Sequence, residues 1–187
     1  YPDEQHPPAS LLEAAATMGN TDYRHCLCFH SLSKRSNLPG LRSGFVAGDP
    51  HWIEQFRRYR TYHGCAMPPH HQIASEWAWS DELHVRDNRA RYREKFAAVT
   101  PILAPVLATP SPDAGFYLWP ETPTDDETFA QHLLQHAGVK VLPGRYLARD
   151  TAGGNPGANR VRLALVAELG QCVEAAERIV HAVKSGG

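Results

Sequence analysis

No stretch of this sequence is both long and apolar enough to cross a bilayer, so we expect no membrane-spanning segment. The net charge is also close to zero, because 19 basic and 20 acidic side chains leave the chain at −1. A chain this close to neutral has no electrostatic means of attracting nucleic acid or an acidic membrane surface. With 187 residues, 42% of them hydrophobic, it can still bury a core. We therefore expect a globular protein that binds neither nucleic acid nor membrane.

Cysteine is rare, and none of the four cysteines has the spacing of zinc ligands or of a redox pair. Cys26 and Cys28 are two residues apart in an expected strand. We expect reduced, mostly buried thiols, no metal site and a cytoplasmic protein. No basic-then-apolar leader opens the chain, which gives no reason to expect secretion. The first residue is Tyr1 rather than Met, which indicates a fragment or a partial reading frame.

Acidic residues are missing between Asp22 and Asp49, and this gap holds the most informative stretch of the chain. From residue 31 to residue 44 it reads Ser-Leu-Ser-Lys-Arg-Ser-Asn-Leu-Pro-Gly-Leu-Arg-Ser-Gly. Lys34 lies just after an apolar run, among hydroxyls and the cations Arg35 and Arg42. Hydroxyls and arginines at a strand end, with no acid nearby, are typical of a phosphate site.

This stretch resembles the cofactor-lysine signature of the class I/II aminotransferases, which are fold-type I pyridoxal-phosphate enzymes. The signature is a small, an apolar and a small residue, then Lys, followed by a glycine and by an arginine eight residues after the lysine. The matching residues are Ser31, Leu32, Ser33, Lys34, Gly40, Arg42 and Gly44. Ser43 departs from it, because an aliphatic residue is usual there. The wider wording from His30 to Asp49 is most similar to N-succinyl-diaminopimelate aminotransferases.

The resemblance implies a role for three of these residues. Lys34 would form a Schiff base with pyridoxal 5′-phosphate and move a proton at the α-carbon of the substrate. Ser31 and Arg42 would bind the cofactor phosphate. The alternatives are a surface lysine on a basic turn, an exposed turn arginine and a capping serine. Arg35 and Ser33 are weaker candidates that either face solvent or satisfy backbone groups.

A second arginine lies in a strand near the C-terminus. In Arg160-Val-Arg-Leu-Ala-Leu165, alternation places Val161, Leu163 and Leu165 on one face and Arg162 on the other. The segment resembles the family's Arg-aliphatic-Ala-Leu motif, which implies that Arg162 binds the substrate α-carboxylate. A surface Arg–Asp pair is the alternative, and Arg160 is a competing candidate. Phe116 and Tyr117 resemble the aromatic segment that lines the family's substrate pocket, although core packing explains them equally well.

Hydrophobic patterns and helix signals predict an α/β fold in two parts. The first part should hold a helix at 11–18, a buried strand at 26–31, a strand at 44–47 and a helix capped by Asp49 and Pro50. A single long helix from about 71 to 99 should link the two parts. The second should hold strands at 116–119, 139–142 and 161–166, a helix opened by the capping box Thr124–Glu127 and a final helix.

The resemblance covers nearly all of this chain but only the C-terminal half of such an enzyme. It implies that residues 1–85 are the C-terminal part of the cofactor-binding large domain and residues 86–187 the small C-terminal domain. It also implies an amino-acid donor, namely N-succinyl-diaminopimelate, a 2-oxo acid acceptor, namely 2-oxoglutarate, and a role in lysine biosynthesis. A homodimer is implied for the full-length protein. A pyridoxal-phosphate lyase and an inactive, non-catalytic anion-binding fragment stay open as alternatives.

Overall fold

The computed structural model describes residues 7–186 as a mixed α/β fold, as the sequence predicted, and the chain divides into two compact units. The first unit is Pro8–Asn88 and the second begins at Arg89. The sequence-based expectation had placed the boundary after residue 85. Each unit is described by itself below. None of the helices in the described part of the chain has the length and apolar character needed to cross a membrane.

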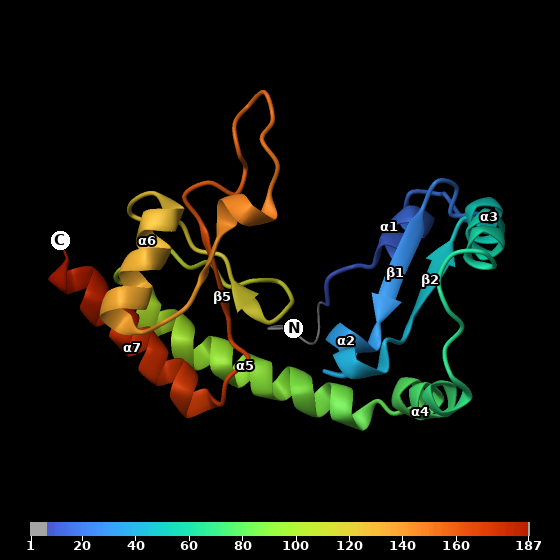
Figure 1. The fold of residues 1–187 in the computed structure, drawn as a ribbon, viewed down its shortest axis with the longest axis horizontal. Coiled ribbons are helices and arrows are strands. Elements are labelled where there is room, and N and C mark those ends of the chain that lie inside the picture. Colours follow the sequence, from blue (N-terminus) through green and yellow to red (C-terminus); the bar gives the residue numbers. More distant parts are fainter. Residues whose placement is uncertain (1–6, 187) are drawn as a thin grey trace. The chain divides into compact units, whose positions relative to one another are not determined.

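The first unit is a two-stranded sheet with short helices (Figure 1). Its elements are α1 (Leu11–Thr17), β1 (Leu27–Ser31), α2 (Leu32–Arg35), the 3₁₀ turn η1 (Pro39–Leu41), β2 (Gly44–Gly48), α3 (Pro50–Arg60), α4 (Pro69–Ser80) and the first turns of α5 (Leu83–Leu103).

Strands β1 and β2 form an antiparallel pair in which Ser31 faces Gly44 and Leu27 faces Gly48. The prediction that the first strand is buried was wrong. Its Phe29 is 65% exposed, and Phe45 on the neighbouring strand is 50% exposed. Phe29 is opposite Val46 and Phe45 is opposite His30, so the two exposed rings lie on opposite faces of the strand pair. Within the described residues, this two-stranded sheet is therefore covered incompletely on both faces.

The start of α3 and the break between α4 and α5 are both visible in the backbone. Asp49 caps α3, because its carboxylate accepts the backbone N–H of His51 at 2.9 Å, and Pro50 occupies the first helical position, as predicted. The single long helix predicted from 71 to 99 is wrong, because the chain breaks between α4 and α5. Asp81 takes an extended conformation there (φ −91°, ψ 117°), and its carboxylate accepts the N–H of Leu83.

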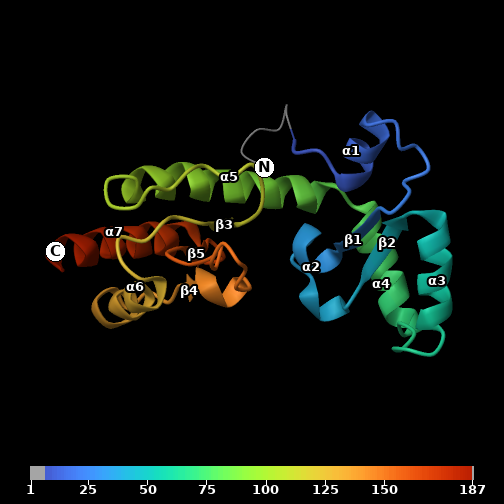
Figure 2. The same ribbon diagram turned by 90° about the horizontal axis from the view of Figure 1, so that it is seen from above.

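The second unit packs helices against one face of a three-stranded antiparallel sheet of order β3-β5-β4 (Figure 2). It contains the rest of α5, β3 (Tyr117–Leu118), α6 (Asp126–His132), the π-helical turn η2 (Leu133–Ala137), β4 (Leu142–Pro143), the 3₁₀ turn η3 (Gly144–Leu147), β5 (Val161–Ala164) and α7 (Leu169–Ser185).

The hydrophobic core of the second unit lies between this sheet and α5, α6 and α7. Its members are all buried: Phe96, Val99, Leu103, Leu107, Leu118, Phe129, Leu133, Ala137, Val141, Val161, Leu163, Leu165, Cys172, Ala176, Ile179 and Ala182. The predicted capping box at the start of α6 was wrong by one position. Asp125 is the N-cap and accepts from the backbone of Glu127 and Thr128, so Thr124 lies outside the helix.

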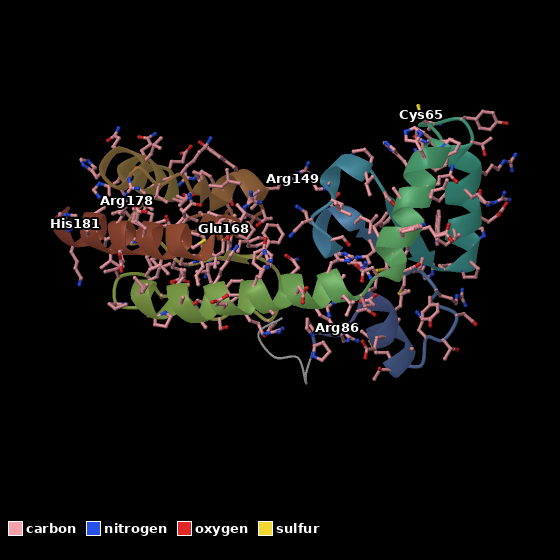
Figure 3. All side chains as sticks on the ribbon, turned by 90° about the horizontal axis from the view of Figure 1, so that it is seen from below. Cys65, Arg86, Arg149, Glu168, Arg178 and His181 are labelled. Carbon is pink, nitrogen blue, oxygen red and sulfur yellow. The ribbon has the colours of Figure 1, made fainter. Side chains whose placement is uncertain are left out.

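The four cysteines are all free thiols in this structure. The expectation of mostly buried thiols holds for Cys172 only. Cys26 and Cys28 are half-buried, and Cys65 is exposed in the loop between α3 and α4, where Figure 3 labels it. No group of three or more metal-binding side chains occurs among residues 7–186.

Candidate active site

The segment that follows β1 forms a closed loop, residues 32–43, which we call the lysine loop. Its two ends are joined, because the N–H of Leu32 donates to the carbonyl of Ser43 at 3.1 Å. The side chain of Leu32 is fully buried, and its carbonyl accepts the N–H groups of Ser36 and Leu38 at 3.0 and 3.1 Å. The loop is therefore built around one anchored leucine. Lys34 lies two residues beyond this anchor, in α2.

The structure places the three predicted cofactor-binding residues on or beside this loop. Ser31 ends β1 and is half-buried, and its hydroxyl makes no capping bond to α2. Lys34 is exposed on α2. Arg42 is exposed in a left-handed conformation (φ 52°), with Nη1 donating to the carbonyl of Pro39 at 2.8 Å. Because the loop closes on itself, all three belong to one end of the β1–β2 pair.

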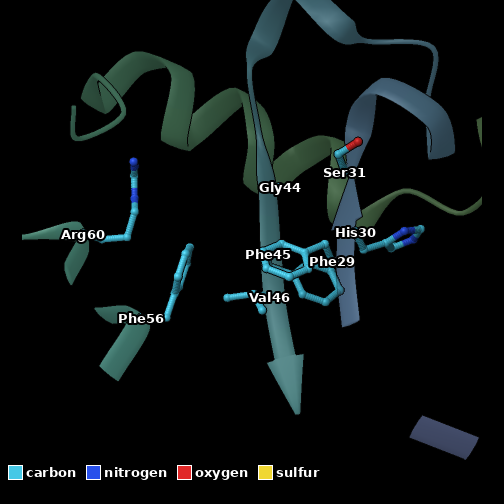
Figure 4. Close-up of a pocket in the computed structure, with 8 residues that line it drawn as sticks. All are labelled: Phe29, His30, Ser31, Gly44, Phe45, Val46, Phe56 and Arg60. Atoms are coloured by element: carbon cyan, nitrogen blue, oxygen red, sulfur yellow. The ribbon is translucent and has the colours of Figure 1, made fainter. Parts of the chain in front are cut away.

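A hollow of about 420 Å³ lies beside this end of the strand pair (Figure 4). It is lined by Phe29, His30, Ser31, Gly44, Phe45, Val46, Phe56 and Arg60. Figure 4 shows Phe29, Phe45 and Val46 grouped on the two strands, whereas Phe56 and Arg60 come from α3. Ser31 is the predicted site residue that lines this hollow, and Lys34 and Arg42 lie outside its lining. Most of the lining side chains are apolar, and Ser31 and Arg60 add a hydroxyl and a guanidinium.

The donor set formed by Ser31 and the lysine loop fits a phosphate-bearing aldehyde. Ser31 offers a hydroxyl, Arg42 a guanidinium and Lys34 an amine, which suit a phosphate dianion and a carbonyl carbon. Gly44, opposite Ser31, keeps the strand end narrow, since a Cβ there would lie 2.6 Å from the carbonyl oxygen of His30. The residues present therefore match the chemistry of pyridoxal 5′-phosphate.

In the second unit, the two candidate arginines have different partners: Arg160 directly precedes β5, and Arg162 lies within it. Arg160 forms an ion pair with Glu121, with Nη2 at 2.5 Å from the carboxylate, and it also donates to the carbonyl of Trp119 at 3.3 Å. Arg162 forms no ion pair within residues 7–186, and its guanidinium lies 5.6 Å from the centre of the Tyr117 ring. The structure thus leaves Arg162, rather than Arg160, available to an anion.

Arg162 and Tyr117 lie close together because the register of β3 and β5 places both side chains on the same face of the sheet. Tyr117 pairs with Ala164, and Leu118 pairs with Leu163, so Tyr117 shares the face of Arg162 while Leu118 and Leu163 turn to the core. The predicted alternation of this strand is confirmed, since Val161 and Leu163 are buried and Arg162 is half-buried. Tyr117 is 40% exposed, so its ring belongs to the open face of the sheet and not to the core.

Sequence reasoning missed the partners that hold the site residues. Arg35, expected to face solvent or satisfy backbone groups, satisfies backbone carbonyls of α4. The carboxylate of Asp126 accepts hydrogen bonds from Arg145 and from the N–H of Asn159, two residues before β5 begins. No sequence signal links Arg35 to a helix more than 40 residues away, or Asp126 to Asn159.

Comparison with known proteins shows what this chain is similar to. The model of the family "Aminotransferase class I and II" matches residues 6–179. A probable aminotransferase of Mycobacterium tuberculosis is 36% identical over 161 residues, which cover 86% of this chain and 36% of the relative. An aminotransferase of Neisseria meningitidis with a solved structure is 54% identical, with a TM-score of 0.89 over 96% of this chain and 45% of that one. A probable N-succinyldiaminopimelate aminotransferase of Thermus thermophilus is 31% identical, with a TM-score of 0.75 over 87% of this chain and 43% of that one.

The chain therefore spans less than half the length of these three relatives. The similarity nevertheless runs through both compact units, because the matched residues 6–179 include the lysine loop and β5. The α/β fold, the lysine signature and the match over most of the sequence agree with one another. This chain belongs to the class I and II aminotransferase family.

Proposed function

We propose that this chain is the part of a pyridoxal-phosphate-dependent aminotransferase that carries the cofactor lysine, Lys34. One observation supports this most directly: Ser31, Lys34 and Arg42 are brought to one end of the β1–β2 pair by a loop whose ends are hydrogen-bonded to each other. Residues 8–88 would then be part of the cofactor-binding large domain, and the second unit would be the small C-terminal domain.

Each site residue has a distinct role in this proposal. When bound, the cofactor ring supplies an electron sink for the bond broken at the substrate α-carbon. The Lys34 amine would hold the cofactor aldehyde and, once released by substrate, remove the proton from that α-carbon. Ser31 and Arg42 would hold the phosphate through a hydroxyl and a guanidinium. Arg162 would hold the substrate α-carboxylate through two parallel hydrogen bonds, with Tyr117 beneath its guanidinium.

For the substrates we propose N-succinyl-diaminopimelate as amino donor and 2-oxoglutarate as acceptor, in lysine biosynthesis. Two facts favour this donor: the similarity of residues 30–49 to N-succinyl-diaminopimelate aminotransferases, and the name of the Thermus thermophilus relative, a probable N-succinyldiaminopimelate aminotransferase. We further propose that the whole protein works in the cytoplasm as a homodimer. Screening amino donors, with release of the 2-oxo acid as the readout, separates this transaminase from a lyase.

The Lys34 assignment is tested by trapping the cofactor on the protein. We expect added pyridoxal 5′-phosphate to give an absorbance band near the visible edge, and borohydride followed by peptide mapping to place the label on Lys34. Lys34→Ala should abolish both signals. Lys184→Ala, which removes an exposed lysine from α7, should leave both unchanged. A label on another lysine, or no label at all, would show that Lys34 is not the cofactor lysine.

A further inference from the structure

The residue after Lys34, Arg35, is far less exposed than the lysine. The side chain of Arg35 is only 9% exposed, whereas Lys34 is exposed. Its Nη1 donates to the carbonyl of Ala78 at 2.8 Å, and its Nη2 donates to the carbonyl of Trp79 at 3.3 Å. The guanidinium also lies 5.2 Å from the centre of the Trp79 ring. Arg35 thus hydrogen-bonds to the C-terminal end of α4 although it belongs to a different element.

These carbonyls are the ones that α4 cannot satisfy by itself. The last carbonyls of any helix have no partner within the helix, and they carry the negative end of its dipole. Helix α4 has no basic residue in its own last turn. Arg35 supplies that charge, donates also to the carbonyl of Asp81 at 3.4 Å, and pairs with the carboxylate of Glu82. The lysine loop therefore acts as the C-terminal cap of α4.

A second polar contact fixes the loop just beyond Arg35. Asn37, in a left-handed conformation (φ 52°), donates from Nδ2 to Oδ1 of Asn88 on α5 at 2.7 Å. The two anchors, at positions 35 and 37, lie on the same side of Lys34 in the sequence. The buried side chain of Leu32 anchors its other side.

The spacing of the anchors determines where Lys34 points. Residues three apart on a helix share a face, so Leu32 and Arg35 can both face the interior of the unit. Lys34 is two positions from Leu32, which is a rotation of about 200° around the helix axis. With Leu32 and Arg35 both held, the single turn of α2 cannot rotate, and Lys34 is kept on the opposite, exposed face.

We propose that Arg35 is a positioning residue that fixes the rotation of α2 and thereby holds the Lys34 amine in register with the phosphate ligands Ser31 and Arg42. This inference rests on the proposed function of Lys34. Without Arg35 the amine would still react with an aldehyde, but the phosphate ligands would no longer be placed to assist it. The quantity that reports this placement is the preference of Lys34 for pyridoxal 5′-phosphate over pyridoxal, which lacks the phosphate.

The experiment measures that preference in the 187-residue chain, as the ratio of borohydride-trapped label on Lys34 with each probe. In Arg35→Met we expect the ratio to fall by about tenfold or more, because small errors in placement are costly to a reacting group. Arg58→Met, which removes an exposed arginine from α3, should keep the ratio of the original chain. Arg35→Met should also speed amide deuterium exchange in residues 32–43, which is measured without any cofactor.

The outcomes separate this inference from the proposed function. If the original chain labels Lys34 with no preference for the phosphate form, or labels another lysine, the proposed function fails and the positioning role fails with it. If the original chain shows the preference and Arg35→Met keeps it within about twofold, the positioning role alone is overturned. Should Arg35→Met lose its circular dichroism signal, Arg35→Lys decides the matter. Lysine keeps the charge without the planar fork, so a retained preference overturns the role and a lost one supports it.

Discussion

The pair formed by Asp126 and Arg145 gives the sharpest quantitative test of the second unit. Asp126 is fully buried, and its carboxylate accepts bonds from Nε of Arg145 at 2.7 Å, the N–H of Arg145 at 3.0 Å and the N–H of Asn159 at 3.4 Å. Burial by itself would raise the pKa of Asp126, but these hydrogen bonds outweigh it, so the pKa lies below its usual value. Folding therefore favours the charged carboxylate.

We expect Asp126→Asn to lower the free energy of unfolding by about 3 kcal/mol, the lower end of the cost of breaking a buried ion pair. The lower end applies because Arg145 keeps Asp125 and Glu127 as partners. With a urea m-value of about 2 kcal/mol per molar, the midpoint should fall by about 1.5 M. Asp125→Asn is the matched control. Asp125 contacts the same arginine but its side chain is 44% exposed, and asparagine caps a helix as well as aspartate, so the loss should stay below about 1 kcal/mol.

The pH dependence follows from the direction of the pKa shift. The pKa of Asp126 is lower in the folded chain than the value of about 3.9 expected when unfolded, so its contribution is complete above that value. It is lost as the pH falls through the folded pKa. The difference in urea midpoint between the original chain and Asp126→Asn, followed by far-ultraviolet circular dichroism, should thus shrink below about pH 4. A difference that stays constant from pH 7 to pH 3, or equal losses for Asp125→Asn and Asp126→Asn, would refute this reasoning.

Two further predictions concern the open faces of the two units. Arg162→Lys should raise the KM for the amino donor by about 10- to 100-fold, because lysine cannot make the two parallel bonds to the carboxylate. Arg160→Lys should raise it by less than about threefold, because Arg160 is already paired with Glu121. Equal effects of the two substitutions on KM would contradict the assignment. The exposed rings of Phe29 and Phe45 should make the 187-residue chain associate as its concentration rises, more than Phe29→Ser/Phe45→Ser. A sedimentation coefficient that does not change with concentration would argue against this.

Elements set by neighbouring residues could be predicted from the sequence. The start of α3 follows from Asp49 and Pro50, because an aspartate cap and a proline in the first turn act within three residues. Which side chains of β5 face the core follows from the strict alternation of Val161, Arg162 and Leu163. Both signals are local, so no tertiary contact was needed to interpret them.

Elements set by distant residues could not be predicted. The break between α4 and α5 was missed because the end of α4 carries no glycine and no basic residue of its own, and is stabilised by Arg35 from the lysine loop. The partner of Arg160 could not be predicted either. Alternation and the family resemblance already favour Arg162, and the structure adds that Arg160 is paired with Glu121.

Ser43 shows how the structure accounts for a departure from the family pattern. An aliphatic residue is usual at this position, whereas here the buried Ser43 hydroxyl accepts Nε1–H of Trp79 at 3.4 Å. Trp79 is half-buried, so its indole N–H gains a partner inside the unit that an aliphatic residue at position 43 would not provide. The same indole ring lies against Arg35, and the Ser43 carbonyl accepts the N–H of Leu32. Two residues of the lysine loop, Arg35 and Ser43, therefore contact one side chain of α4, and a substitution at Trp79 would affect both contacts at once.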